Sequence, residues 1–307
     1  MGARDLNVVR DTLPNIFEDW PVDRIIEPGG TVIPVDDPTI YDRATEEQRN
    51  QPADLDQIGA DLLDEGLLKD WPQTGVREPG DFGGAPVTHE FGEYDATPDC
   101  LAFYLPWHFF YPDWWGVYLR FDGLLYLADG IQTRSNSAVP SRTAIQMARL
   151  FLYYHEAFHH LTECYAFRLE ATHRHPIYKK TFVARYQKTF GTHDCLEEGL
   201  ANAHALRKCA VAARRIGNSA IIEALREYVT QSPPGYSRGV KFEGRLFRPT
   251  QCEFAEVNQR DAVPTAPDLD PAIWLTSTHM FHGITNIKSR VKYYLPPGSP
   301  LRDRIPF

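Results

Sequence analysis

The chain has 307 residues, of which 43% are hydrophobic, and a formal net charge of −9. This length and apolar content allow one large core or two small ones. No apolar run approaches the length of a membrane span, and the first residues lack the apolar region of a secretory signal. Five cysteines without a C-x-x-C pair favour free thiols over a disulfide framework. We therefore expect a cytoplasmic protein with no membrane association.

The acidic residues are concentrated near the start of the chain. Residues 1–70 hold seventeen acids against six bases, a balance of −11, whereas residues 71–307 hold twenty-four acids and twenty-six bases, a balance of +2. A solvated acidic face is the usual explanation. An alternative is that this segment packs near the basic region at 178–215 and restricts access to a cleft there. No basic stripe with interleaved aromatic residues is present, so we expect no nucleic-acid binding.

The first hundred residues differ in composition from the rest. They are rich in proline, glycine and aspartate. We expect a strand at 31–35, one helix at roughly 54–71 and otherwise irregular structure that packs on a larger body. The sequence therefore predicts an acidic N-terminal segment at 1–99 and the main domain at 100–307.

An aromatic-rich stretch at 100–131 opens the main domain. Two apolar runs, at 117–121 and 124–128, flank Asp122 and Gly123. Asp-Gly between two such runs predicts a β-hairpin with a type I′ turn. Its exposed edge could align an extended peptide by main-chain hydrogen bonds.

The sequence H-E-x-x-H occupies His155 to His159, within a segment at 141–172 that favours a helix. Neither glycine nor proline occurs between 142 and 169. On a helix, His155 and His159 share a face, so both imidazoles can bind one metal ion. Glu156 lies about 100° round the helix, within reach of a water molecule on that ion. The alternative is a fortuitous match on a surface helix, but apolar residues lead up to this face.

Further elements are expected after this helix. The pattern predicts helices at 195–215 and 220–229 and strands at 240–247 and 290–295. Residues 235–239 spell G-x-S-x-G, the sequence of a serine-hydrolase nucleophile elbow, which needs a preceding strand and a following helix. Because Pro233 and Pro234 come directly before it, we interpret it as a turn.

A catalytic zinc ion needs a third protein ligand besides the two histidines. Glu163, one turn after His159, lies too far along the helix axis. A second helix at 195–215, packed antiparallel to the first, is better placed. At its start Asp194 and Glu197 form a D-x-x-E capping box, and Glu198 is the next acid. We take Glu198 as the third ligand and Asp194 as the alternative.

This arrangement resembles the gluzincin group of zinc metallopeptidases. In that group a later helix supplies a ligand glutamate, and an Asp or Asn four residues on hydrogen-bonds a ligand histidine; Glu198 and Asn202 match this spacing. The run E-x-x-A-N also looks like bacterial peptidases that cleave phage-type repressors. The glycine and histidine of metzincins are replaced by Thr162 and Tyr165. Residues 191–194 are similar to the G-T-x-D of aspzincins, but the following Tyr-Gly is missing.

The resemblance covers two short motifs between residues 155 and 202. It implies a zincin-like α+β fold, in which an active-site helix packs on a small sheet, with a β-hairpin before it and a second ligand-bearing helix after it. It also implies a Zn²⁺ cofactor held by His155, His159 and Glu198, with Asn202 orienting one histidine.

The function that we expect is zinc-dependent hydrolysis of peptide bonds in an intracellular protein or peptide. Glu156 would take a proton from the attacking water and pass it to the leaving amine. His279, His282 and Tyr293 are candidates for stabilising the transition state. The alternatives are a non-catalytic protein with a structural zinc site, or a zinc hydrolase of a non-peptide amide. The sequence predicts no oligomeric state.

Overall fold

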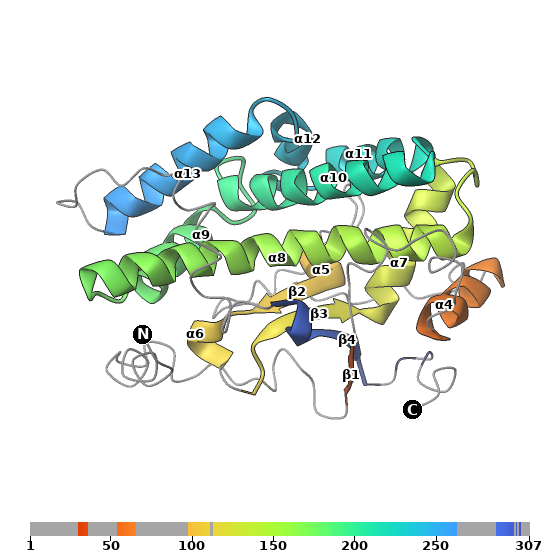
Figure 1. Cartoon of the computed structure of the whole chain (residues 1–307), viewed down its shortest axis with the longest axis horizontal. Coiled ribbons are helices and arrows are strands. Elements are labelled where there is room, and N and C mark those ends of the chain that lie inside the picture. Colours follow the sequence, from red (N-terminus) through yellow and green to blue (C-terminus); the bar gives the residue numbers. More distant parts are fainter. Residues whose placement is uncertain are drawn as a thin grey trace.

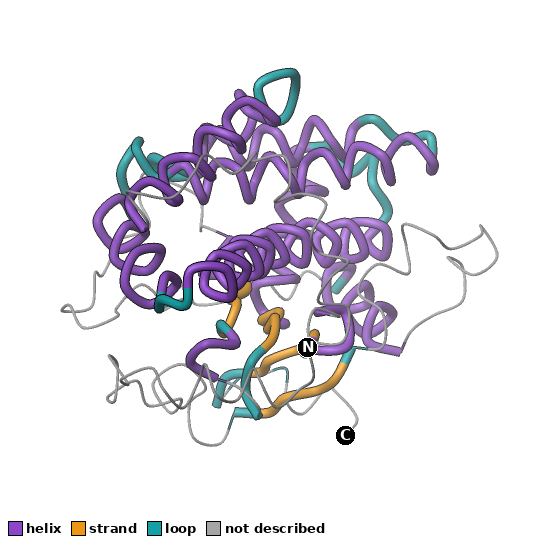
Figure 2. The backbone as a smooth tube through the Cα atoms, turned by 60° about the vertical axis from the view of Figure 1, so that its left-hand side comes forward, coloured by secondary structure: helices purple, strands orange, loops and turns teal. Residues whose placement is uncertain are grey.

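A single long helix organises the molecule. The computed structural model describes residues 30–35, 54–65, 98–110, 113–262, 287–297, 299 and 301. Helix α8 (Ser141–His173) runs across the middle, with a small sheet on one side and a layer of helices on the other (Figure 1). The tube view separates the same two sides of α8 (Figure 2). The helix predicted at 141–172 is therefore confirmed.

Helix α8 is buried along most of its length because it is covered from both sides. Its first half carries apolar residues that are fully inaccessible, among them Ile145, Phe151 and Leu152. It ends where Arg174 adopts a left-handed conformation with φ of 53°. A helix buried on all faces has little amphipathic character. The polar side chains that it buries therefore need partners inside the protein.

The four strands form one mixed sheet with the order β1-β4-β3-β2. The outer pairs, β1 (Thr31–Pro34) with β4 (Val291–Leu295) and β2 (Ala102–Leu105) with β3 (Gly116–Arg120), are antiparallel. The inner pair, β3 with β4, is parallel. Strands predicted at 31–35 and 290–295 are confirmed. A small sheet against many helices makes the fold α+β, as expected.

The predicted β-hairpin is wrong. Strand β3 ends at Arg120, and residues 121–134 form helix α7 (Phe121–Arg134). Asp122 accepts hydrogen bonds from Arg120 and from the backbone N–H of Gly123, at the first turn of α7. Gly123 is needed for close packing and not for a turn, because a Cβ there would lie 2.6 Å from the Cα of Leu101. Strand β3 pairs instead with β2, across a longer connection.

The strand predicted at 240–247 is also wrong. This region forms the short helix α12 (Gly239–Phe242), a turn, and the start of helix α13 (Phe247–Ala262). The alternating apolar residues that suggested a strand do not share a face, since Phe242 is buried whereas Leu246 is 45% exposed. A Cβ on Gly239 would lie 2.5 Å from that of Asn202, so α12 approaches helix α10 (Leu196–Ile216) very closely.

The remaining elements fill the two sides of α8. They are α4 (Asp54–Asp64), α5 (Pro98–Leu101), α6 (Trp107–Phe110), the π-helical turn η3 (Tyr178–Phe182), α9 (Val183–Thr189), α11 (Ala220–Gln231), and the 3₁₀ turns η4 (Tyr236–Arg238) and η6 (Ile287–Arg290). The helices predicted at 195–215 and 220–229 correspond to α10 and α11. The turn predicted at 235–239 contains η4. Among the described residues, no helix has the length and apolar character to cross a membrane.

Parts of the predicted N-terminal segment are built into the main body. Strand β1 pairs with β4, and buried Asp56 of α4 forms an ion pair with buried Arg149 of α8 at 2.6 Å. The predicted boundary between residues 99 and 100 falls inside α5. Most of residues 1–97, including the proposed contact of the acidic segment with a cleft, lie outside the described residues.

Candidate metal centre

Three of the predicted ligands converge at the contact between α8 and α10. His155 and His159 share one face of α8, and their Nε2 atoms are 3.4 Å apart. Glu198, in the first turn of α10, places Oε2 at 3.2 Å from Nε2 of His155 and 3.7 Å from Nε2 of His159. The Glu198 side chain is fully buried. Three atoms of the type that binds zinc therefore face one point.

The spacing of these three atoms fits a single zinc ion. A tetrahedral ion with bonds of about 2.0–2.1 Å has ligand atoms roughly 3.3–3.4 Å apart. The observed separations of 3.2, 3.4 and 3.7 Å lie around this value. Neither carboxylate oxygen of Glu198 has a hydrogen-bond partner among the described residues. A buried carboxylate in this state is costly unless a cation accompanies it, so the donor set fits Zn²⁺.

A fourth donor, Asp99 of α5, was missed by the sequence reasoning. Its Oδ1 lies 3.8 Å from Nε2 of both His155 and His159. The ligand atoms of Asp99, His155, His159 and Glu198 all lie within 4.8 Å of one another. No spacing in the sequence indicates Asp99, because its position depends on how a four-residue helix packs against α7.

The electrostatics of this group favour positive charge at its centre. Burial lowers the pKa of His155, but Asp99 and Glu198 outweigh burial and raise this pKa to about 10. Burial also lowers the pKa of His159, yet the neighbouring carboxylates, with Glu198 first, raise it well above its ordinary value. Burial raises the pKa of Asp99, but its contacts with the two histidines lower this pKa to about 2. The cluster therefore attracts a proton or a metal cation.

Both histidines are oriented by partners on α10. Asn202 Oδ1 lies 2.9 Å from Nδ1 of His155, and the amide nitrogen of Asn202 donates to the backbone oxygen of Tyr236 at 3.1 Å. Because the amide oxygen can only accept, Nδ1 of His155 carries the proton and Nε2 is left to bind a metal. The contact predicted for Asn202 is present. Glu197 Oε1 lies 2.9 Å from Nδ1 of His159 and fixes that ring in the same way.

The predicted capping box at 194–197 is wrong. The N-cap of α10 is Cys195, without a side-chain hydrogen bond, and Glu197 bonds His159 instead of the helix backbone. Asp194 is exposed and is not among the described residues whose ligand atoms converge. A glutamate in the first turn of α10 reaches α8 because the two helices are in direct contact, whereas Asp194 precedes that turn.

Glu156 is buried beside the ligands with neither carboxylate oxygen hydrogen-bonded to a described residue. Burial and the negative charge of Asp99 raise its pKa to about 8. Desolvation without a fixed partner is the usual state of a carboxyl group that exchanges protons with a ligand or water. Glu156 thus differs from the other acidic residues of α8, which have partners.

Glu163, set aside as a ligand, belongs to a separate buried network. His108 on α6 contacts Glu163 at 2.6 Å through Nδ1 and Glu170 at 2.9 Å through Nε2. Burial lowers the pKa of His108, but the charges of Glu170 and Glu163 outweigh it and raise this pKa to about 9. Backbone N–H groups of His108 and Trp107 also donate to Glu163. This cationic histidine fastens α6 to the second half of α8.

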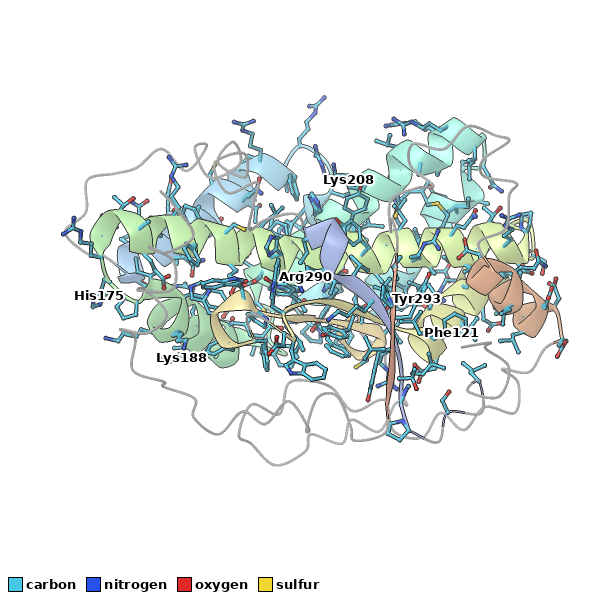
Figure 3. The ribbon with its side chains drawn as sticks, turned by 60° about the horizontal axis from the view of Figure 1, so that its bottom comes forward. Phe121, His175, Lys188, Lys208, Arg290 and Tyr293 are labelled. Carbon is cyan, nitrogen blue, oxygen red and sulfur yellow. The ribbon has the colours of Figure 1, made fainter. Side chains whose placement is uncertain are left out.

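Of the predicted stabilisers of a transition state, the one that the structure describes, Tyr293, does not join the site. His279 and His282 lie outside the described residues. Tyr293 lies beside Phe121, towards α4 (Figure 3), and its hydroxyl accepts a hydrogen bond from Arg149 at 3.2 Å. Its place in the central part of the sheet, where the side chain faces the first half of α8, keeps it with Arg149 and away from the ligand group.

Two other tyrosines are adjacent to the ligands. Tyr236, from the turn at 235–239, stacks on His155 with ring centroids 6.2 Å apart, and its hydroxyl donates to Oδ2 of Asp99. Tyr186 of α9 lies edge-on to His159, also at 6.2 Å. Burial and the charges of neighbouring carboxylates raise the pKa of both phenols well above the ordinary value, so both remain protonated hydrogen-bond donors.

A pocket opens next to this group, between α9, α10 and α13. Its enclosed volume is small, about 30 Å³, which is room for roughly two water molecules. Its lining includes both polar and apolar side chains: Arg185, Tyr186, Thr189, Asp194, Leu196, Glu197, Phe254, Val257 and Asn258. Tyr186 and Glu197 also contact His159, so the pocket lies one residue away from the ligand group.

Comparison of the chain with protein-family models, with curated proteins and with solved structures finds no match.

Proposed function

We propose that the protein is a zinc-dependent hydrolase that cleaves peptide bonds. The observation that carries this proposal is the convergence of His155, His159 and Glu198 beside a buried carboxyl group, that of Glu156, which has no partner among the described residues. In this interpretation the fold is zincin-like and of the gluzincin type. Its active-site helix α8 packs on a small sheet, and α10 is the second ligand-bearing helix.

The roles of the residues follow from their positions. A zinc ion held by the three ligands would polarise the scissile carbonyl and lower the pKa of water. Glu156 takes the proton of the attacking water and returns it to the leaving nitrogen. Asn202 and Glu197 hold the two imidazoles in the metal-binding tautomer. Tyr186 is the nearby phenol available to donate to an oxyanion, because the hydroxyl of Tyr236 already donates to Asp99.

The substrate that we propose is an intracellular protein or peptide. The pocket between α9, α10 and α13 shares Tyr186 and Glu197 with the surroundings of His159, and its polar and apolar lining offers a surface that a peptide near the cleaved bond can contact. A non-peptide amide would need the same chemistry, but the sequence and the structure offer no feature that favours it.

One observation favours a different class, a structural zinc site. Asp99 supplies a fourth protein donor, and a site closed by four protein ligands is typical of structural zinc. Glu156 argues against this class, because a structural site has no use for a buried carboxyl group beside its ligands. Burying the Glu156 carboxyl group without a partner costs stability. A catalytic role explains why it is placed there.

The experiment that tests the proposal is Glu156→Gln, with Glu253→Gln on an exposed face of α13 as the matched control. The variant keeps one zinc ion per chain and the wild-type fold, but it loses hydrolysis of a labelled unfolded protein. Removal of a general base lowers the rate by about 10²–10⁴-fold. If Glu156→Gln instead loses its zinc, Glu156 is a ligand and the proposed mechanism is wrong.

A further inference from the structure

We propose that Asp99 is a reversible fourth ligand, which closes the metal centre in the resting protein and is released, still hydrogen-bonded to Tyr236, when a substrate or water molecule binds. This inference rests on the proposed metal site and adds to it a means of regulation. Such a site combines features of a structural and a catalytic zinc site, because it has four protein ligands at rest and three during hydrolysis.

The position of Asp99 is that of a fourth ligand. His155, His159 and Glu198 provide three donor atoms, and Oδ1 of Asp99 is equidistant, at 3.8 Å, from both imidazole nitrogens. Glu198 lies at 3.2 Å and 3.7 Å from the same nitrogens. Asp99 is thus farther than Glu198 from both imidazole nitrogens.

Solvent access also distinguishes Asp99 from the other carboxylate. The Asp99 side chain is 13% exposed, whereas those of Glu198 and His155 are fully buried. The exposed part of the group therefore includes Asp99. His159, at 11% exposure, is the neighbouring donor, and it faces the pocket through Tyr186 and Glu197.

The backbone that carries Asp99 is fixed, so only the side chain can move. Cys100 and Leu101 of α5 are buried, and Leu101 packs so closely on α7 that a Cβ on Gly123 would lie 2.6 Å from its Cα and from its carbonyl oxygen. Release of Asp99 is then a rotation of one carboxylate. Displacement of a whole segment is not required.

Tyr236 holds this carboxylate both before and after release. Its hydroxyl donates to Oδ2 of Asp99, the oxygen that is not directed at both histidines. Tyr236 is itself held in place, because its ring stacks on His155 and its backbone oxygen accepts from Asn202. When Oδ1 leaves the metal, the carboxylate keeps a charge-assisted hydrogen bond and does not become a buried unpaired anion.

The test uses the full chain loaded with Co²⁺, whose visible absorption reports the number of ligands, and azide as the incoming probe. In wild type, azide displaces Asp99 and changes the spectrum at high concentration. In Asp99→Asn, whose side chain has the same size, azide binds at least about tenfold more tightly and Co²⁺ at least about tenfold more weakly, the size of effect typical of ligand perturbation. The control, Asp194→Asn, alters an exposed carboxylate that lines the adjacent pocket, and it behaves as wild type.

Three results separate the possible failures. If Asp99→Asn, folded by circular dichroism, shows the metal and azide affinities of wild type, Asp99 is not a ligand. If Asp99→Asn loses metal affinity but wild type shows no response to saturating azide, Asp99 is a permanent ligand and the site is closed. If wild type binds no Co²⁺, the proposed function fails together with the inference.

Discussion

The buried cation at His108 gives a prediction about stability that does not depend on any metal. Its imidazole lies between Glu163 and Glu170, at 2.6 Å and 2.9 Å, and all three side chains are at most 3% exposed. Replacing His108 with Gln leaves two buried carboxylates without a counter-charge. Removal of one partner from a buried ion pair costs about 3–5 kcal/mol. We expect a loss of that order in the free energy of unfolding near pH 6.

The pH dependence of this stabilisation follows from the direction in which folding shifts the pKa of His108. The pKa of His108 is raised from 6.5 to about 9 in the folded protein, which corresponds to about 3 kcal/mol. Because the folded-state value is the higher one, this stabilisation is fully present below pH 6.5. The stabilisation declines as the pH rises from 6.5 to about 9, and it is lost above about pH 9. The difference in stability between wild type and His108→Gln therefore narrows by about 3 kcal/mol over this range.

The assay is urea unfolding of both proteins at about pH 6 and about pH 10, with a chelator present so that metal binding makes no contribution. His175→Gln, at an exposed position near the end of α8 (Figure 3), is the matched control and has a stability difference close to zero at both pH values. Parallel pH profiles for wild type and His108→Gln would refute the reasoning, because they would mean that His108 is uncharged in the folded protein.

Two further predictions concern packing and the orientation of a ligand. Gly123→Ala destabilises the protein by about 1–3 kcal/mol or more, because the added Cβ meets the backbone of Leu101. The control is Gly244→Ala, where nothing lies within 4 Å of the added carbon. It changes the free energy of unfolding by less than about 0.5 kcal/mol. Asn202→Leu weakens zinc binding by about 10–100-fold in a chelator competition, because His155 loses the partner that fixes its tautomer; unchanged affinity would show that the contact is incidental.

Elements with a continuous local signal could be predicted from the sequence. Helix α8 has no glycine or proline between 142 and 169, and α10 ends at Gly217, whose φ of 70° is a conformation that glycine adopts easily. The failures occurred where distant contacts decide the structure. Asp122-Gly123 has the sequence of a hairpin turn. The glycine is needed there for a different reason, because α5 packs too closely on α7 to leave room for a Cβ.

The same distinction applies to the candidate site. His155, Glu156 and His159 are linked by helical spacing, and the contacts between Asn202 and His155 follow from a second helix packed on the first. The sequence suggested a capping role for Glu197, but the structure uses this residue to orient His159. Asp99 could not be found, because nothing in its neighbourhood in the sequence indicates that α5 places this carboxylate beside the two histidines.

The measurement that tests the central claim most directly is zinc binding by wild type, Glu198→Ala and Asp194→Ala, with stoichiometry from elemental analysis and affinity from chelator competition. Glu198 is fully buried with its Oε2 at 3.2 Å from His155, whereas Asp194 is exposed. We predict one zinc ion per chain in wild type and in Asp194→Ala. In Glu198→Ala the affinity for zinc falls by more than about 100-fold, because the loss of a ligand costs more than the loss of a residue that only orients a ligand. A site emptied by Asp194→Ala and retained by Glu198→Ala would contradict the account.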